Sequence, residues 1–146
     1  MKPYTFIEGH ETVLERFGMW PSFHDGEVHR LVLDSTRRDQ HGNRYASVEL
    51  QLRGWIVTAE VTEHGFYRCN FDSVVSFLFE NVTSVEFDGL NHQNVLSSLD
   101  LEVVQAASGT NELKVVLEHC FGLSGEFVAG SAKVLSVTPF AKPNDA

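Results

Sequence analysis

From residue 27 onward, apolar and polar side chains alternate with a period of two, and this pattern constrains the fold more than any other feature. Successive side chains of a β-strand point to opposite faces, so alternation predicts strands with one face in a core and one in water. The clearest stretches are 48–53, 75–80, 99–103 and 113–118. Such segments recur about every 8 to 12 residues with short turns between them, which predicts an all-β antiparallel sandwich or flattened barrel of about 7–9 strands.

The first half of this pattern predicts a long hairpin. Segments 28–34 and 48–53 flank a polar turn region at 37–44. We expect the second strand of the hairpin to run on to Val61, with Gly54 as a bulge or bend, because glycine inside a strand weakens regular pairing.

One short helix is predicted before the strands, at about 10–17. Val13, Leu14 and Phe17 fall at helical spacing, Gly18 is placed to end the helix, and Pro21 forbids its continuation. No linker or repeat divides the remaining chain, so we expect one domain over 1–146, with strands over about 27–138 and a frayed C-terminal tail within 139–146.

The net charge bears on the class of partner. The chain has 20 acidic and 11 basic residues, a net charge of −9, with 42% apolar residues. Such a surface repels nucleic acid and anionic lipid, and it attracts basic proteins. Charge alone favours a simpler explanation, in which the acidic surface serves only solubility. No run of 18 apolar residues and no apolar signal core occurs, so we expect a cytoplasmic protein that binds neither membranes nor nucleic acid. The oligomeric state stays open.

The two cysteines, Cys69 and Cys120, are too few and too isolated for a disulfide framework. Aromatic residues flank both, so we predict that both thiols are buried or half-buried and unreactive.

The densest polar cluster lies at 20–29. Four side chains that could bind a metal fall within six residues: His24, Asp25, Glu27 and His29. In a strand, the last three would share one face and His24 would point away. Three interpretations are open: a structural corner held by local hydrogen bonds, a corner that contacts a partner, or a metal or catalytic site. The structural one is favoured, because Trp20, Pro21 and Phe23 surround the cluster with packing groups.

A second polar cluster lies at 88–94. Asp88, Gly89 and the Asn residues there are typical of a long turn. His92 could approach His24 in space and form a site with it, although a solvated loop is the favoured interpretation.

Sequence signatures of common enzymes are missing. The chain contains no Gly-x-Ser-x-Gly elbow, no phosphate-binding glycine loop, no His-Glu-x-x-His and no dinucleotide-binding fingerprint. We therefore expect a binding protein without catalytic residues or cofactor. Two alternatives remain: a metal-dependent enzyme or metal-binding module that uses His24, Asp25 and Glu27, and a small-ligand-binding β domain with an aromatic pocket between its sheets.

The stretch Trp20-Pro21-Ser22-Phe23-His24-Asp25-Gly26-Glu27-Val28 resembles the bacterial family known as immunity protein 50, which carries a similar Trp-Pro-x-Phe-His-Asp-x-Glu motif. The segment 87–95 is also similar to the family, and the likeness covers about residues 18 to 138. Gly26 stands where the family is expected to have a small residue such as Ala. The resemblance implies a non-catalytic inhibitor that binds and neutralises a cognate protein toxin, without identifying the toxin.

A nuclease toxin would have to be basic to hold phosphate, and an acidic inhibitor would be steered onto it. Exposed acids expected to supply that attraction are Glu49, Glu60, Glu63, Glu86, Asp88, Asp100 and Glu102. Trp55 and Tyr67 are candidate aromatic anchors. The residues predicted to contact a partner are His24, Asp25, Glu27, Trp55, Asp88 and His92.

Overall fold

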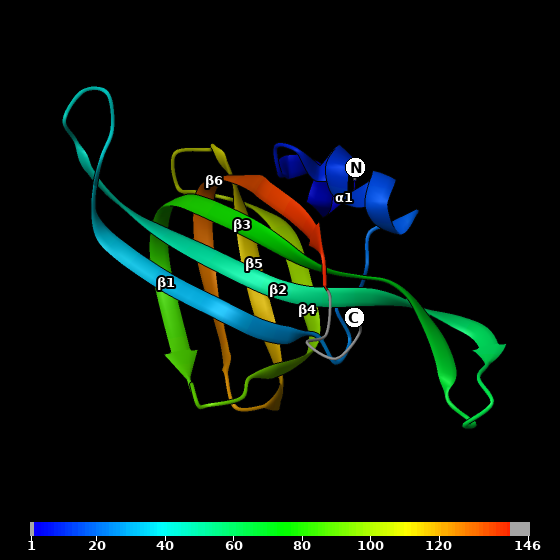
Figure 1. Cartoon of the computed structure of the whole chain (residues 1–146). Helices are drawn as coiled ribbons and strands as arrows, with labels where there is room; N and C mark the ends of the chain where they lie inside the picture. Colours follow the sequence, from blue (N-terminus) through cyan, green and yellow to red (C-terminus); the bar gives the residue numbers. More distant parts are fainter. Residues whose placement is uncertain (1, 141–146) are drawn as a thin grey trace.

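A computed structural model describes residues 2–140 of the chain (Figure 1). The elements follow in the order η1 (Pro3–Phe6), α1 (His10–Phe17), β1 (Glu27–Arg38), β2 (Arg44–Val61), β3 (Tyr67–Asp88), β4 (Val95–Gln105), β5 (Asn111–Phe121) and β6 (Ser124–Pro139). The predicted all-β class with one short N-terminal helix is confirmed. The predicted frayed tail falls largely on 141–146, outside the described residues.

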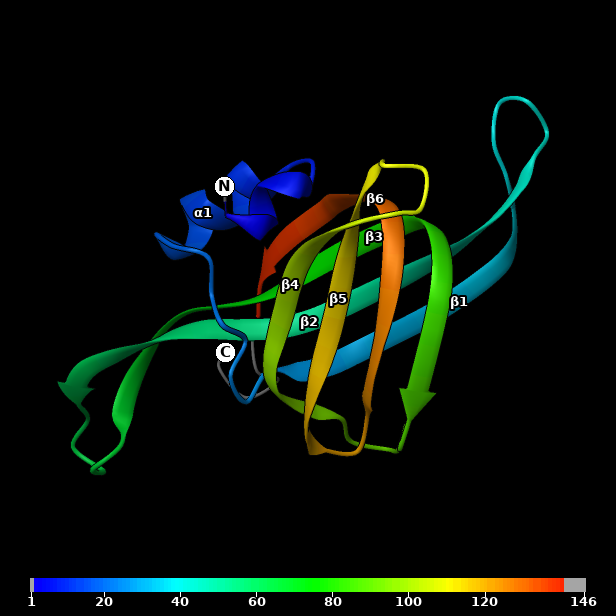
Figure 2. The same ribbon diagram turned by 180° about the vertical axis from the view of Figure 1, so that it is seen from behind.

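The six strands form one closed antiparallel barrel in the order β1-β2-β3-β6-β5-β4. The barrel closes where Glu27 of β1 pairs with Val95 of β4. Two backbone bonds flank this pair, from Val28 N–H to the Asn94 carbonyl and from Leu96 N–H to the Gly26 carbonyl. Figure 2 shows β4, β5, β6 and the C-terminal part of β3 side by side as one curved wall.

The prediction of seven to nine strands is wrong, because six long strands bend instead of ending. Segments 75–80 and 85–88 both belong to β3, and 127–130 and 134–137 both belong to β6. Asn81 bends β3 with a φ of 54°, and the register with β6 shifts just beyond it. Gly130 permits this bend, since a Cβ there would lie 3.1 Å from the Asn81 Cβ.

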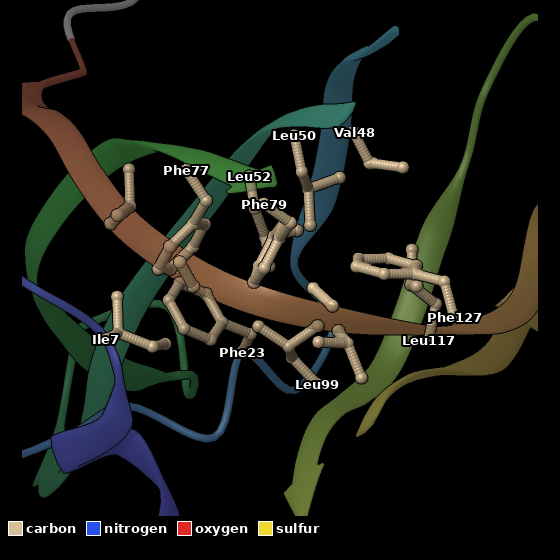
Figure 3. Close-up of a cluster of buried hydrophobic side chains, with 14 of the residues drawn as sticks. Ile7, Phe23, Val48, Leu50, Leu52, Phe77, Phe79, Leu99, Leu117 and Phe127 are labelled. Carbon is tan, nitrogen blue, oxygen red and sulfur yellow. The ribbon is translucent and has the colours of Figure 1, made fainter. Parts of the chain in front are cut away.

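The alternating apolar side chains fill the barrel, as their spacing predicts. Val48, Leu50 and Leu52 of β2 are fully buried against the phenylalanines of β3 and β6 (Figure 3). Phe79 and Phe127 pack edge to face with ring centroids 4.9 Å apart. Aromatic rings in this geometry contribute about 0.5–1.5 kcal/mol beyond their buried area.

The predicted helix bounds are confirmed by α1. Gly18 adopts a left-handed conformation with φ 76°, and its N–H donates to the Leu14 carbonyl at 2.8 Å. Val13 and Phe17 are buried, so the short helix is held by packing rather than by propensity. Glu8 forms backbone bonds with β6 just ahead of α1, and this fixes the N-terminal segment against the barrel.

Cys69 and Cys120 are both exposed, so the prediction of buried thiols is wrong. Cys69 lies on the part of β3 that projects beyond the barrel, where its aromatic neighbours have no core to enter. Within residues 2–140, no helix is long and apolar enough to cross a membrane.

Candidate binding surface

The hairpin of β2 and β3 continues past the barrel as a two-stranded ribbon, residues 55–72, which we call the arm (Figure 1). Pairing between β1 and β2 ends at Arg53, and pairing between β6 and β3 begins at Ser73. Among residues 2–140, positions 55–71 of the arm therefore pair only within the arm, and at its root the Asp72 carbonyl accepts the Phe140 N–H at 2.9 Å. The apolar side chains of a two-stranded hairpin have no further strand or layer to pack against, and for this reason such a hairpin is only marginally stable alone.

The arm exposes large apolar side chains. Phe66 is 72% exposed and Tyr67 is 63% exposed, and the others are Val57, Val61 and Phe71. Contiguous exposed apolar surface on a soluble domain is typical of an interaction site.

Arg53 fixes the root of the arm. Its Nε and Nη2 donate to the two carboxylate oxygens of Asp72 at 2.9 and 2.6 Å. The guanidinium carbon also lies 3.9 Å from the centroid of the Phe140 ring. The hydrogen bonds to Asp72 hold the pKa of Arg53 above its ordinary value. The arm thus leaves the barrel from a rigid base.

Phe23 holds the corner before β1 against the root of the arm. It adopts a left-handed backbone with φ 60°, and its side chain is almost fully buried over Gly54. A Cβ at Gly54 would lie 2.5 Å from the Phe23 ring, and the β2–β3 register shifts just after Gly54. The predicted bulge at Gly54 is therefore confirmed. Gly26 is equally constrained, because a Cβ there would lie 2.7 Å from the Arg53 carbonyl oxygen.

His24 and Asp25 lie exposed on this corner. The His24 Nδ1–H donates to the Ser97 carbonyl of β4 at 2.9 Å, since a carbonyl can only accept. That bond leaves Nε2 facing the Asp25 carboxylate at 3.6 Å. His24 thus ties the corner to β4, in keeping with the structural interpretation, while its outer edge stays available to a partner.

Glu27 pairs with His29 instead of joining the other two, at 3.4 Å between Oε1 and Nε2. The expected common face of Asp25, Glu27 and His29 is wrong, because Asp25 has φ 62° and lies before β1 begins. The cluster splits into two separate pairs. Within residues 2–140, no three His, Cys, Asp or Glu side chains lie together in a way that could hold a metal ion.

Among the described residues, Asp88 and His92 form no hydrogen bond or ion pair with His24 or Asp25 of this corner. Asp88 ends β3 on the outer surface, and His92 donates from Nδ1 to the Asn91 side chain at 2.9 Å within its own loop. No hydrogen bond joins His92 to His24 among the residues described.

Sequence reasoning missed Asn94 of this loop, which is 7% exposed and hydrogen-bonded on both side-chain ends. Its place directly before the apolar Val95 and Leu96 was the available signal.

Carboxylate side chains are concentrated on the outer face of β4, β5, β6 and the C-terminal part of β3. In one cross-strand row, Asp100 lies opposite Val116, which lies opposite Glu126, which lies opposite Glu86. The set that we call the acidic face comprises Glu86, Asp88, Asp100, Glu102, Glu112, Glu118 and Glu126. Lys114, 3.3 Å from Glu126, is the one Lys or Arg among residues 82–88, 95–105, 111–121 and 124–130.

Hollows adjoin the acidic face, and two of them bear on its function. One, of about 740 Å³, lies among Glu86, Glu118 and Glu126. The other, of about 380 Å³, lies between the corner and the root of the arm, and we call it the tryptophan groove. Trp20 and Trp55 line it, together with Val57, and Asp100 brings the acidic face to it.

Comparison with known proteins identifies no relative of this chain. No protein-family model, curated protein or solved structure matches the chain. The resemblance to immunity protein 50 gains no support from these comparisons and stays an expectation that rests on the motif at 20–28.

Proposed function

We propose that this protein is a non-catalytic binding protein that neutralises a basic protein by covering its cationic surface. The observation that carries the proposal is the acidic face, with seven carboxylates and one lysine on a single wall of the barrel. Neighbouring strands lie about 4.8 Å apart, well within the Debye length of roughly 8 Å in physiological salt. The carboxylates therefore act as one field, which speeds the encounter with a cationic partner and excludes anionic ones.

The partner class follows from the same field and from the motif resemblance. A bacterial toxin that cuts nucleic acid must present Lys and Arg to phosphate. An inhibitor with an acidic face competes with nucleic acid for that surface, and needs no chemistry of its own. The proposed partner is thus a cognate, basic protein toxin.

The other two candidate functions find less in the structure to support them. Phe77, Phe79 and Phe127 pack inside the barrel, where a ligand pocket between sheets was expected. The alternative metal set, His24, Asp25 and Glu27, is divided between two separate side-chain pairs. No specific observation favours either function.

The proposal is tested by pull-down from extract of the native cell, at low and at high salt. We expect one basic protein at low salt and weaker recovery at high salt, since exposed charge pairs are screened. The purified partner is then titrated against the triple variant Glu86→Gln, Glu118→Gln, Glu126→Gln. We expect its affinity to fall about tenfold or more, mainly through slower association.

The matched control is the triple variant Glu8→Gln, Glu11→Gln, Glu15→Gln, which removes the same charge outside the acidic face. We expect its affinity to stay within about twofold of the unmodified protein. Equal losses in both variants would show that net charge alone matters, and the acidic face would lose its role. Absence of any protein partner at low salt would contradict the proposal altogether.

A further inference from the structure

We infer that the tryptophan groove seats an arginine side chain of the basic partner, so that the groove anchors the complex that the acidic face attracts. The inference rests on the proposed function and adds to it the position and chemistry of the anchor. Interfaces typically owe most of their affinity to a few buried aromatic and arginine contacts, and charges at the rim contribute mainly to the rate of association.

The chemistry of the groove suits a guanidinium group. Trp20 and Trp55 supply aromatic surface, and a planar cation packs on such rings more favourably than on aliphatic walls. Asp100 supplies the counter-charge, because it is exposed and forms no salt bridge within the described residues. The chain itself places a guanidinium group over one of these rings, since the Arg53 guanidinium carbon lies 5.4 Å from the Trp55 ring centroid. Arg53 is committed to Asp72 and leaves Asp100 uncompensated.

Contacts on three sides fix the walls of the groove in advance. Trp20 stacks on Tyr4 with centroids 5.1 Å apart and ring planes 4° apart. His24, which also lines the groove, is tied to β4 through the Ser97 carbonyl. The ion pair at Arg53 holds the root of the arm that carries Trp55. A preformed site loses little conformational entropy on binding, which raises the affinity that a single side chain can give.

The groove adjoins both the acidic face and the exposed apolar side chains of the arm. Asp100 lies in the same cross-strand row as Glu126 and Glu86 of the acidic face. Val57 lines the groove and belongs to the exposed apolar side chains of the arm. Apolar contacts flanked by charges are the usual composition of a protein–protein interface. A second copy of this chain fits poorly, because each copy carries a net charge of −9 and would bring its own acidic face to Asp100.

The first test needs no partner. Trp20 and Trp55 are the two tryptophans of the chain, so intrinsic fluorescence reports directly on the groove. The probe is the capped peptide acetyl-Gly-Arg-Gly-amide, and its control has citrulline, which has nearly the same shape without the charge. We expect a saturable fluorescence change with a Kd on the order of 1–10 mM for the arginine peptide, and at least about fivefold weaker binding of the citrulline peptide.

The variants in this test are Asp100→Asn and, as matched control, Glu15→Gln, which removes an exposed acid outside both the groove and the acidic face. We expect Asp100→Asn to abolish saturation and Glu15→Gln to preserve it. Equal responses to both peptides, equal losses in both variants, or no saturation in the unmodified protein would each overturn the inference. Concentration-dependent dimerisation that blocks the peptide would overturn it too, by showing that a second copy fills the groove.

The second test separates the groove from the acidic face in the purified complex. We expect Asp100→Asn and Val57→Ser to speed dissociation about tenfold each, with the salt dependence little changed by Val57→Ser. Val57 is 54% exposed, so this change should leave the fold intact. If these variants bind normally while the acidic-face triple variant binds weakly, the groove inference is wrong and the proposed function stands. If neither set has an effect, both are wrong.

Discussion

The side-chain oxygen of Asn94 accepts the backbone N–H of Leu123 at 3.0 Å, and so joins the loop before β4 to the turn before β6. The same oxygen accepts the Asn91 N–H, and the Asn94 Nδ2 donates to the Asn91 carbonyl. The backbone carbonyl of Asn94 accepts from Val28 of β1. One nearly buried residue therefore holds three segments together where the barrel closes, two through its side-chain amide and the third through its backbone carbonyl.

Replacing Asn94 with Ala should destabilise the protein by about 2–4 kcal/mol, because it leaves buried N–H and C=O groups without partners. Urea denaturation followed by circular dichroism measures the free energy of unfolding. The neighbouring exposed Gln93 gives the control, and Gln93→Ala should change that free energy by less than about 0.5 kcal/mol. Similar values for the two variants would contradict the role assigned to Asn94.

Replacing Gly54 with Ala should cost about 1–3 kcal/mol, since the added methyl group would meet the Phe23 ring. A smaller residue at position 23 makes room for that methyl group. The double variant Gly54→Ala, Phe23→Leu should therefore be more stable than the sum of the two single changes allows. Strict additivity in a double-mutant cycle would show that the two residues do not compete for space.

Replacing Arg53 with Lys should loosen the arm, because lysine cannot make both hydrogen bonds to Asp72 or stack as a planar group on Phe140. Amide hydrogen exchange over 55–72 should become faster, with a loss of about 1–2 kcal/mol in protection. Arg68→Lys is the control, since the Arg68–Glu60 pair is exposed at both ends. Unchanged exchange in Arg53→Lys would contradict the role of Arg53 in holding the root of the arm.

The pKa of Asp34 should lie below its ordinary value of 3.8, because the Thr36 hydroxyl and then the Thr36 N–H donate to its carboxylate. A carboxyl group with a lowered folded-state pKa stabilises the fold above its unfolded pKa, and this contribution disappears as pH falls through the folded pKa. Titration by NMR should place the Asp34 midpoint below 3.8 and show Thr36→Val moving it upward. A midpoint that Thr36→Val leaves in place would rule out the hydroxyl as the cause.

Adding zinc, manganese or calcium should shift the unfolding temperature by less than about 1 °C, because His24, Asp25 and Glu27 do not converge on one point. Untagged protein and thermal scans with and without a chelator make this measurement. A saturable stabilisation that His24→Ala removes would restore the metal-binding alternative.

Local pattern was enough to predict the strand faces and the helix. The alternation at 48–53 fixes which side chains enter the core, and Gly18 ends α1 by the left-handed conformation that glycine adopts easily. The prediction of the strand count failed because a bend within a strand and the end of a strand look alike in sequence. Asn81 interrupts the apolar pattern of β3 but not its hydrogen-bonded ladder with β6. The prediction that Cys69 is buried failed for a related reason, since its aromatic neighbours lie on an arm that leaves the core.

The candidate binding surface depended on pairings that no local pattern contains. The sequence by itself determined that Glu86 and Asp100 face outward, because period two separates inner from outer side chains. Only the strand order β3-β6-β5-β4 placed these two acids in one row with Glu126. The tertiary structure likewise brought Trp20 and Trp55 to one groove, by packing Phe23 against Gly54. Strand faces follow from local geometry, whereas neighbours across a barrel follow from register and from the closure of the whole sheet.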